Sequence, residues 1–275
     1  MILICNGMPR AGSTLQYNLA RLVIEESALG EAHGYYAKDD YQHSLRLFAS
    51  WRRDCRFHLV KTHDLLPIVG EAQRSEAISV CYIYRNLFDV AASLKRKFKL
   101  EDEPLLTRLD DMIAVHDELI KIPGTLVQRY EDVVAALPNA VCQIANLVGV
   151  ALESEAIHRI ADRCSLTSMK SELPRRTWLG RCLQDVYQRY LGRRLQLRRR
   201  LMRAGLPERF LSGLKNRVYG IDPRTLVHAD HISSNDGKDG NWQEMLDETL
   251  IRIIGHRFRR WLETTGYDAA TAANN

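Results

Sequence analysis

Short, nearly continuous apolar runs alternate with helical patterns through the first half of this chain. The apolar runs cover residues 1–6, 57–61, 78–84 and 126–130, and helical patterns follow at 13–27, 87–97 and 131–148. Apolar strands that are separated by helices are typical of a parallel sheet that is covered on both faces. We therefore expect an α/β fold of three layers, with a central parallel sheet of about four to five strands and helices on both faces.

The second half of the chain is helical in pattern and is expected to complete one domain over residues 1–275. An Arg-rich segment at about 174–228 predicts a helical hairpin, because Pro207 interrupts its apolar periodicity. Ten arginines and one acid lie between Arg175 and Arg203, whereas the whole chain has a net charge of +5. A Gly-rich loop at 231–240 then precedes a predicted closing helix at 242–262. The hairpin is a candidate lid.

Composition favours a soluble globular protein. Apolar residues make up 45% of the 275 positions and charged residues 27%, and no apolar run is long enough to cross a membrane. The six cysteines are scattered and form no Cys-x-x-Cys pair, which fits a reducing compartment. We therefore expect a cytoplasmic protein.

The segment GMPRAGST, residues 7–14, joins the first predicted strand to the first predicted helix. A Gly-rich turn at this point directs backbone N–H groups and the positive end of a helix dipole toward one anion. Its spacing resembles that of a Walker A loop, but Ser13 occupies the place of the lysine and the cation is Arg10. The loop predicts a phosphate or sulfate site with chemistry different from that of an NTPase.

Two further strand ends carry polar residues. In LVKTHD, Lys61 and His63 point to the same side because strand side chains alternate with period two. In YIYRNLFDVAASLKRKF, Arg85 ends a strand and Ser93 returns toward the sheet edge one helix later. An arginine with a serine hydroxyl suits a second, terminal phosphate. Asp89 is interpreted as a local partner of Arg85.

Together the motifs PRAGST, KTH, YRNxxDVxxS, YED and GKDGNW, in this order, resemble the sulfotransferases that use 3′-phosphoadenosine-5′-phosphosulfate (PAPS). They span residues 7–242, and their joint order is more specific than any single motif. The resemblance implies a P-loop NTPase-like fold with a metal-free cofactor site. In that site the 5′-phosphosulfate is held by Arg10, Ala11, Gly12, Ser13 and Thr14, and the 3′-phosphate by Arg85 and Ser93. Tyr130 corresponds to the family's tyrosine near the adenine, and Gly237 to the glycine of the C-terminal loop that closes over the 3′-phosphate.

The chain also departs from that family pattern. Asn235 and Asp236 stand where the family usually has Arg-Lys before the loop glycine, and Cys164 stands where it has an adenine-side threonine. Glu131 and Asp132 are interpreted as structural, since acids suit the first turn of a helix.

Sulfuryl transfer needs an in-line acceptor oxygen and stabilisation of the charge on the leaving group. His63 is the predicted general base, and Lys61 and Arg10 the predicted cations at the leaving group. The acceptor is expected to be a small molecule or a glycan, and the Arg-rich hairpin favours an anionic one; no nucleic-acid partner is expected. Two alternatives stay open: a P-loop kinase that uses ATP, and a polyanion-binding protein that uses the Arg-rich segment.

Overall fold

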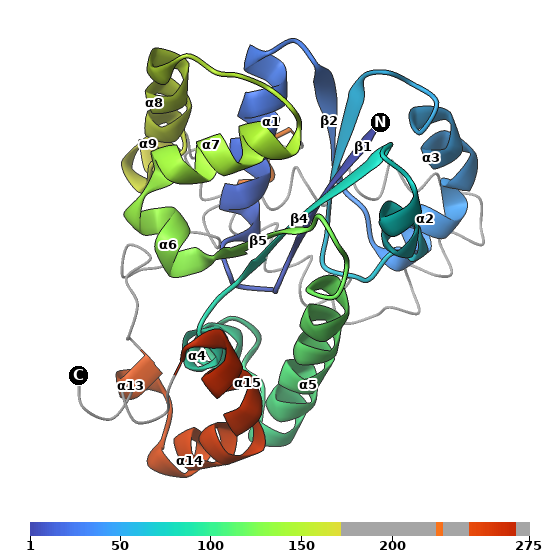
Figure 1. Cartoon of the computed structure of the whole chain (residues 1–275). Helices are drawn as coiled ribbons and strands as arrows, with labels where there is room; N and C mark the ends of the chain where they lie inside the picture. Colours follow the sequence, from blue (N-terminus) through green and yellow to red (C-terminus); the bar gives the residue numbers. More distant parts are fainter. Residues whose placement is uncertain (172–223, 228–241, 268–275) are drawn as a thin grey trace, which may run out of the picture.

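The computed structural model describes residues 1–171, 224–227 and 242–267, and a five-stranded parallel sheet forms its centre (Figure 1). The prediction of an α/β fold with a central parallel sheet is confirmed. The first strand lies in the middle of the sheet, so that the chain must cross over it between the third and fourth strands. The order across the sheet is β2 (Gly30–Tyr35), β3 (Phe57–Thr62), β1 (Ile2–Gly7), β4 (Ile78–Tyr84) and β5 (Leu126–Arg129).

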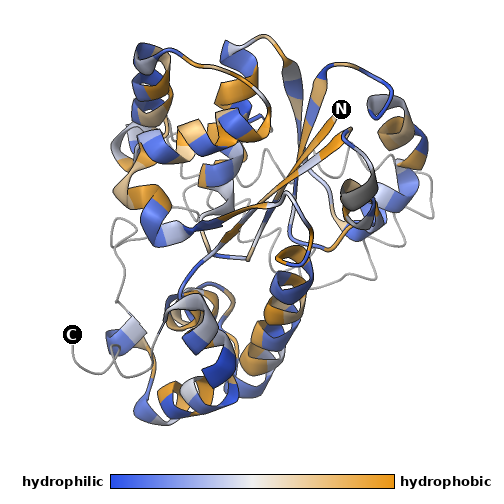
Figure 2. Cartoon of the chain, viewed as in Figure 1, coloured by the Kyte–Doolittle hydropathy of each residue, from blue (hydrophilic) through white to orange (hydrophobic). Residues whose placement is uncertain are grey.

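Alternating side chains of the buried strands supply two cores. Leu3 and Cys5 of β1 belong to one cluster, and Ile2 and Ile4 belong to another on the opposite face. Figure 2 shows the central strands as hydrophobic, which suits strands covered on both sides. The first face packs on α1 (Ser13–Glu26), α7 (Leu137–Leu147) and α8 (Ser154–Arg163), and the second on α2 (Lys38–His43), α3 (Leu45–Trp51) and η1 (Pro67–Arg74).

A third apolar cluster lies beyond the carboxyl end of the sheet. Trp242 stacks on Phe88 with ring centroids 4.7 Å apart, and this contact joins the C-terminal helices to the helix after β4. The cluster thus brings distant parts of the chain to the sheet edge where a ligand is expected (Figure 1). Its elements are α4 (Leu87–Phe98), α5 (Asp102–Leu119), α13 (Trp242–Met245), α14 (Glu248–Arg257) and α15 (Arg259–Thr265).

Two predicted helices are divided in the structure. The pattern at 131–148 forms α6 (Tyr130–Ala135) and α7, which are separated at Ala136 because its backbone is not helical (φ −144°). The closing pattern at 242–262 forms α13, α14 and α15. Asp247 separates the first two, since its Oδ1 accepts a 2.9 Å hydrogen bond from the N–H of Leu250 and caps α14. Beyond α7 and α8 lies the short helix α9 (Leu166–Ser171).

The greater part of the predicted Arg-rich hairpin lies outside the described residues. Residues 224–227 contact α1, where Nδ2 of Asn18 donates to the Thr225 carbonyl oxygen at 2.8 Å and Arg224 pairs with Glu25 at 2.9 Å. None of the helices that the structure describes has the length and apolar character needed to cross a membrane.

Candidate functional site

The loop between β1 and α1 forms a tight cradle that requires both of its glycines. A Cβ on Gly7 would lie 2.4 Å from Cβ of Ser13, and one on Gly12 would lie 2.4 Å from Cδ2 of Tyr130. Gly12 also has a φ of +80°, which disfavours any residue with a side chain. The adjacent Arg10 has a φ of 70°, an uncommon conformation for a residue other than glycine, and such conformations occur preferentially at binding sites.

The first turn of α1 faces this cradle. Gly12, at the N-cap, has no side chain that could cap the helix, and no acidic residue lies in the first turn, so its N–H groups and dipole favour an anion. Gly12, Ser13 and Thr14 line the adjoining cavity. Ala11, which the sequence resemblance placed with the cofactor, is fully buried in the third cluster, and its N–H donates to the Met8 carbonyl at 3.0 Å.

Lys61 and His63 reach the same cavity from the end of β3, as the period-two alternation predicts. The buried Nζ of Lys61 donates to Oγ1 of Thr14 at 2.6 Å, which connects β3 to the start of α1. Nδ1 of His63 lies 2.6 Å from the Gly7 carbonyl oxygen. Because a carbonyl only accepts, Nδ1 carries the proton and Nε2 keeps its lone pair for another partner.

Burial favours the neutral forms of Lys61 and His63. It lowers the pKa of Lys61 to about 7, and the nearby charges of Arg10 and Lys97 also lower it. Burial, followed by the charge of Lys61, lowers the pKa of His63 to about 3. His63 is therefore a neutral proton acceptor at pH 7, and an anion that binds beside these cations would raise both pKa values.

Two arginines complete the cationic side of the cavity. Nε of Arg10 donates to Oγ of Ser93 at 2.8 Å, so the loop after β1 and helix α4 meet directly. Arg85 pairs with Asp89 at 3.3 Å, which confirms the interpretation of Asp89 as its local partner. The Arg85 guanidinium also lies 4.4 Å from the centroid of the Tyr130 ring, a cation–π contact that fixes its direction.

Glu131 is structural, as the sequence analysis interprets it. Its carboxylate accepts hydrogen bonds from the N–H of Asn86, from Nε of Arg129 and from the hydroxyl of Tyr267. These contacts join the start of α4 to the end of β5 and to the segment after α15. They hold the two strand ends that carry Arg85 and Tyr130 in place.

These residues surround one cavity of about 900 Å³ at the carboxyl ends of the central strands. Among the described residues, six Lys or Arg side chains line it against three aspartates, so their field favours an anionic ligand. Part of this lining was not predicted from the sequence, namely Tyr35, Arg96, Lys97 and Arg108 together with the apolar Phe98, Met112, Val115 and Met245.

The remaining predicted residues are divided between the cavity and the undescribed segments. Cys164 lines the cavity together with Ser165, Leu166 and Met169, which places the departure from the family threonine at the site itself. Gly237 lies outside the described residues, as do Asn235 and Asp236. The roles assigned to individual residues stay predictions.

The fold is similar to that of solved sulfotransferases. Mouse sulfotransferase SULT7A1, complexed with PAP, is similar with a TM-score of 0.58 and 16% identity, over 95% of this chain and 84% of that chain. Retinol dehydratase, complexed with retinol and PAP, is similar with a TM-score of 0.54 and 17% identity, over 95% and 81%. Its complex with androsterone and inactive cofactor PAP gives 0.51 and 16%, over 95% and 80%. No family model and no curated protein matches the sequence.

Proposed function

We propose that this chain is a sulfotransferase that transfers a sulfuryl group from PAPS to a hydroxyl or amine of a small-molecule acceptor. The observation that carries the proposal is the convergence of the uncapped start of α1, Lys61, His63 and Arg85 on one cavity of a sulfotransferase fold. The structural neighbours were solved with PAP, which is adenosine 3′,5′-bisphosphate, the product that PAPS leaves when it gives up its sulfuryl group.

The residues present fit such a cofactor. Gly7 and Gly12 let the loop pack tightly against Ser13 and Tyr130, and the N–H groups at the start of the following helix suit an anion. Arg85 and Ser93 lie at the end of the cavity near α4, where an arginine and a hydroxyl suit a 3′-phosphate. Tyr130 supplies a ring for the adenine side, and Arg85 already lies over its face.

Each side chain then has a separate task in the transfer. PAPS, when bound, supplies an activated sulfuryl group with adenosine 3′,5′-bisphosphate as leaving group. Lys61 and Arg10 stabilise the negative charge that grows on the leaving group. His63 takes the proton of the acceptor at Nε2, because the Gly7 carbonyl fixes the proton of the ring on Nδ1. Bound anions raise the pKa of His63 and make it a stronger base.

The acceptor pocket is the apolar part of the same cavity. Phe98, Met112, Val115 and Met245 line it, and the Arg108 guanidinium lies 5.3 Å from the Phe98 ring centroid. This combination suits a mainly apolar acceptor that carries an anionic group. The neighbouring retinol dehydratase binds retinol and androsterone, which are small apolar molecules.

Calorimetric titration of adenosine 3′,5′-bisphosphate in EDTA, compared with ATP in Mg²⁺, tests the proposal. We expect metal-free binding of the bisphosphate, and a loss of roughly 10- to 100-fold in affinity in Arg85→Ala, because that arginine makes charge-assisted hydrogen bonds. Arg257→Ala is the control, since Arg257 is exposed and pairs with Asp110 on the surface. Preference for ATP with Mg²⁺ would instead establish the kinase alternative.

A further inference from the structure

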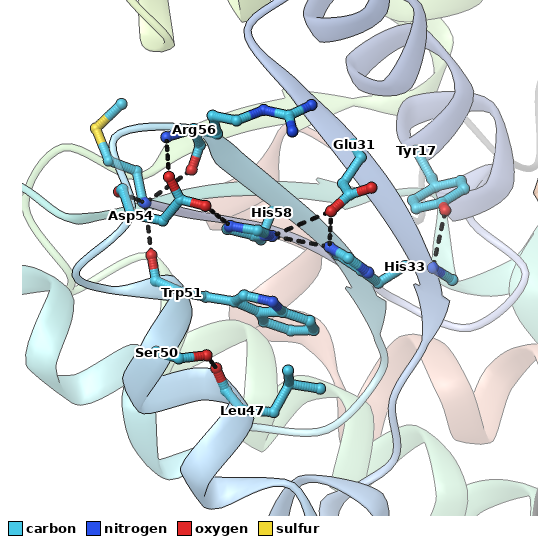
Figure 3. Close-up of polar contacts among 11 residues, drawn as sticks. Tyr17, Glu31, His33, Leu47, Ser50, Trp51, Asp54, Arg56 and His58 are labelled. Carbon is cyan, nitrogen blue, oxygen red and sulfur yellow. Dashed lines mark hydrogen bonds and ion pairs between the residues drawn. The ribbon is translucent and has the colours of Figure 1, made fainter.

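A second cluster of chemically active side chains lies outside the cavity, at the amino end of β3. Glu31, His33 and His58 each offer one ligand atom, and these three atoms lie within 4.8 Å of one another. Figure 3 shows the two imidazoles side by side, with the Glu31 carboxylate directed toward both of them. No step of the proposed transfer uses this cluster.

The backbone explains why the three side chains converge. In the parallel pairing of β2 with β3, the Cα partner of Glu31 is His58, and His33 follows Glu31 by two residues on the same face. The register shifts between Ala32 and Tyr35, and a bulge of this kind redirects side chains. The N–H of Gly34 donates to the Tyr17 hydroxyl at 3.1 Å, which anchors this irregular segment.

The distances fit a small tetrahedral cation. Nε2 of His33 lies 2.9 Å from Nδ1 of His58, and Oε1 of Glu31 lies 3.7 Å and 3.9 Å from these two nitrogens. Ligands about 2.0–2.1 Å from a tetrahedral Zn²⁺ are about 3.3 Å apart, a value that these three distances bracket. Two imidazoles and one carboxylate favour zinc or a similar transition metal over Mg²⁺ or Ca²⁺.

Asp54 orients His58 for this task. Its Oδ2 lies 2.9 Å from Nε2 of His58, and its Oδ1 accepts a 3.0 Å hydrogen bond from the N–H of Arg56. Since an ionised carboxylate only accepts, the His58 proton is on Nε2, and Nδ1 directs its lone pair into the cluster. Metal-ligating histidines are commonly held by a carboxylate in this way.

The surroundings leave one coordination position open. Trp51 covers one side of both imidazoles, stacked 4.2 Å from His33 and 5.0 Å from His58 between ring centroids. The His58 side chain is 6% exposed, whereas that of Glu31 is 55% exposed. A fourth ligand can therefore be a water molecule on the solvent side.

We propose that Glu31, His33 and His58 bind one divalent transition-metal ion of the Zn²⁺ class, which fastens the edge strand β2 to β3. In the metal-free chain the proton between the two imidazoles is on Nε2 of His33. The metal takes the place of that proton, which moves to solvent or to Nδ1 of the same ring. The ion would stabilise β2, which lies at the edge of the sheet that the described residues form.

Titration of the full chain with Co²⁺, followed by its visible d–d absorption, and then displacement by Zn²⁺ tests this proposal. We expect one ion per chain, loss of that site in His33→Gln, and weakening by about 10- to 100-fold in Asp54→Asn, which loses only the orienting carboxylate. Glu31→Gln keeps the fold because Glu31 is exposed, and it removes the anionic ligand. His158→Gln is the matched control, since this histidine is exposed and its Nδ1 is hydrogen-bonded to the Ser154 carbonyl oxygen of its own helix.

Zinc should also raise the midpoint of thermal unfolding of the wild type by several degrees, and this shift should disappear in Glu31→Gln. Absence of Co²⁺ and Zn²⁺ binding in the wild type would overturn the proposal. So would binding that survives both His33→Gln and Glu31→Gln, or binding that is lost in Cys55→Ser, because Cys55 is the exposed thiol nearest in sequence to Asp54.

Discussion

The two ends of β3 each present a histidine, and the neighbours give these two histidines opposite electrostatic surroundings. His58, near the start of the strand, lies between the carboxylates of Asp54 and Glu31. His63, just after its end, lies close to Lys61, whose charge helps to lower the pKa of His63. Carboxylates beside an imidazole favour a bound cation, whereas cations beside it favour a bound anion.

Residue type alone therefore does not decide what an imidazole on this strand can bind. His58 presents Nδ1 because Asp54 holds its Nε2, whereas His63 presents Nε2 because the Gly7 carbonyl holds its Nδ1. Each imidazole is thus directed by a hydrogen bond at its other nitrogen. One end of the strand suits a structural ion and the other a proton transfer.

Replacing His63 gives the largest expected effect. His63→Ala should lower kcat about 10²–10⁴-fold, since general-base help is lost, while the affinity for adenosine 3′,5′-bisphosphate changes little. PAP release from PAPS, with a panel of phenols, alcohols and amines as acceptors, measures turnover, and calorimetry measures affinity. His43→Ala, on the exposed surface of α2, is the control. Unchanged turnover in His63→Ala would contradict the role of His63 as the general base.

Gly12→Ala should disturb the anion site next most strongly. The added Cβ would meet Tyr130, on whose ring Arg85 rests, and φ there is +80°. We expect about tenfold weaker bisphosphate binding and roughly 1–2 kcal/mol lower free energy of unfolding, measured by calorimetry and by urea unfolding. Gly124→Ala separates the two effects, because Gly124 has a φ of +78° and no atom near its added Cβ. Equal bisphosphate affinity in both variants would contradict the proposal that the loop containing Gly12 binds the anion.

The sequence was sufficient to place several polar residues together at the carboxyl end of the sheet. Lys61, His63 and Arg85 were predictable because each directly ends or follows a recognisable apolar strand, and parallel strands end at the same edge. Arg108 was missed because it lies in a long helix far along the chain, and only the packing of α5 brings it to the cavity.

The amino end of the sheet was less accessible to prediction. The sequence GEAHGY of β2 is too polar to be recognised as a strand, and a bulge interrupts it. The cluster of Glu31 and His33 with His58 depends on the pairing register of two strands, which the spacing of these residues along the chain does not reveal. The break at Ala136 was equally hidden, since apolar periodicity continues on both sides of it.

A smaller and more specific effect concerns the proton on Lys61. Its pKa of about 7 leaves the amine mostly neutral at pH 8, and a bound anion would raise that pKa, so binding should take up about one proton. Calorimetry of bisphosphate binding at pH 8, in two buffers of different ionisation enthalpy, measures this uptake. The proton uptake should disappear in Lys61→Met. It should persist in His63→Gln, because the pKa of His63, about 3, is too low for this histidine to account for the uptake at pH 8. Proton release would reverse the sign and contradict the assigned charges.

The smallest expected effect is the influence of one end of β3 on the other. His58 and His63 are five residues apart along an extended strand, roughly 16 Å, and sites at that distance without shared partners usually act independently. Protein loaded with one equivalent of Zn²⁺, freed of excess by dialysis and checked by metal analysis, should bind adenosine 3′,5′-bisphosphate within about twofold of the metal-free protein. A larger change would mean that β3 transmits the state of its amino end to Lys61, and the two histidines would then belong to one coupled system.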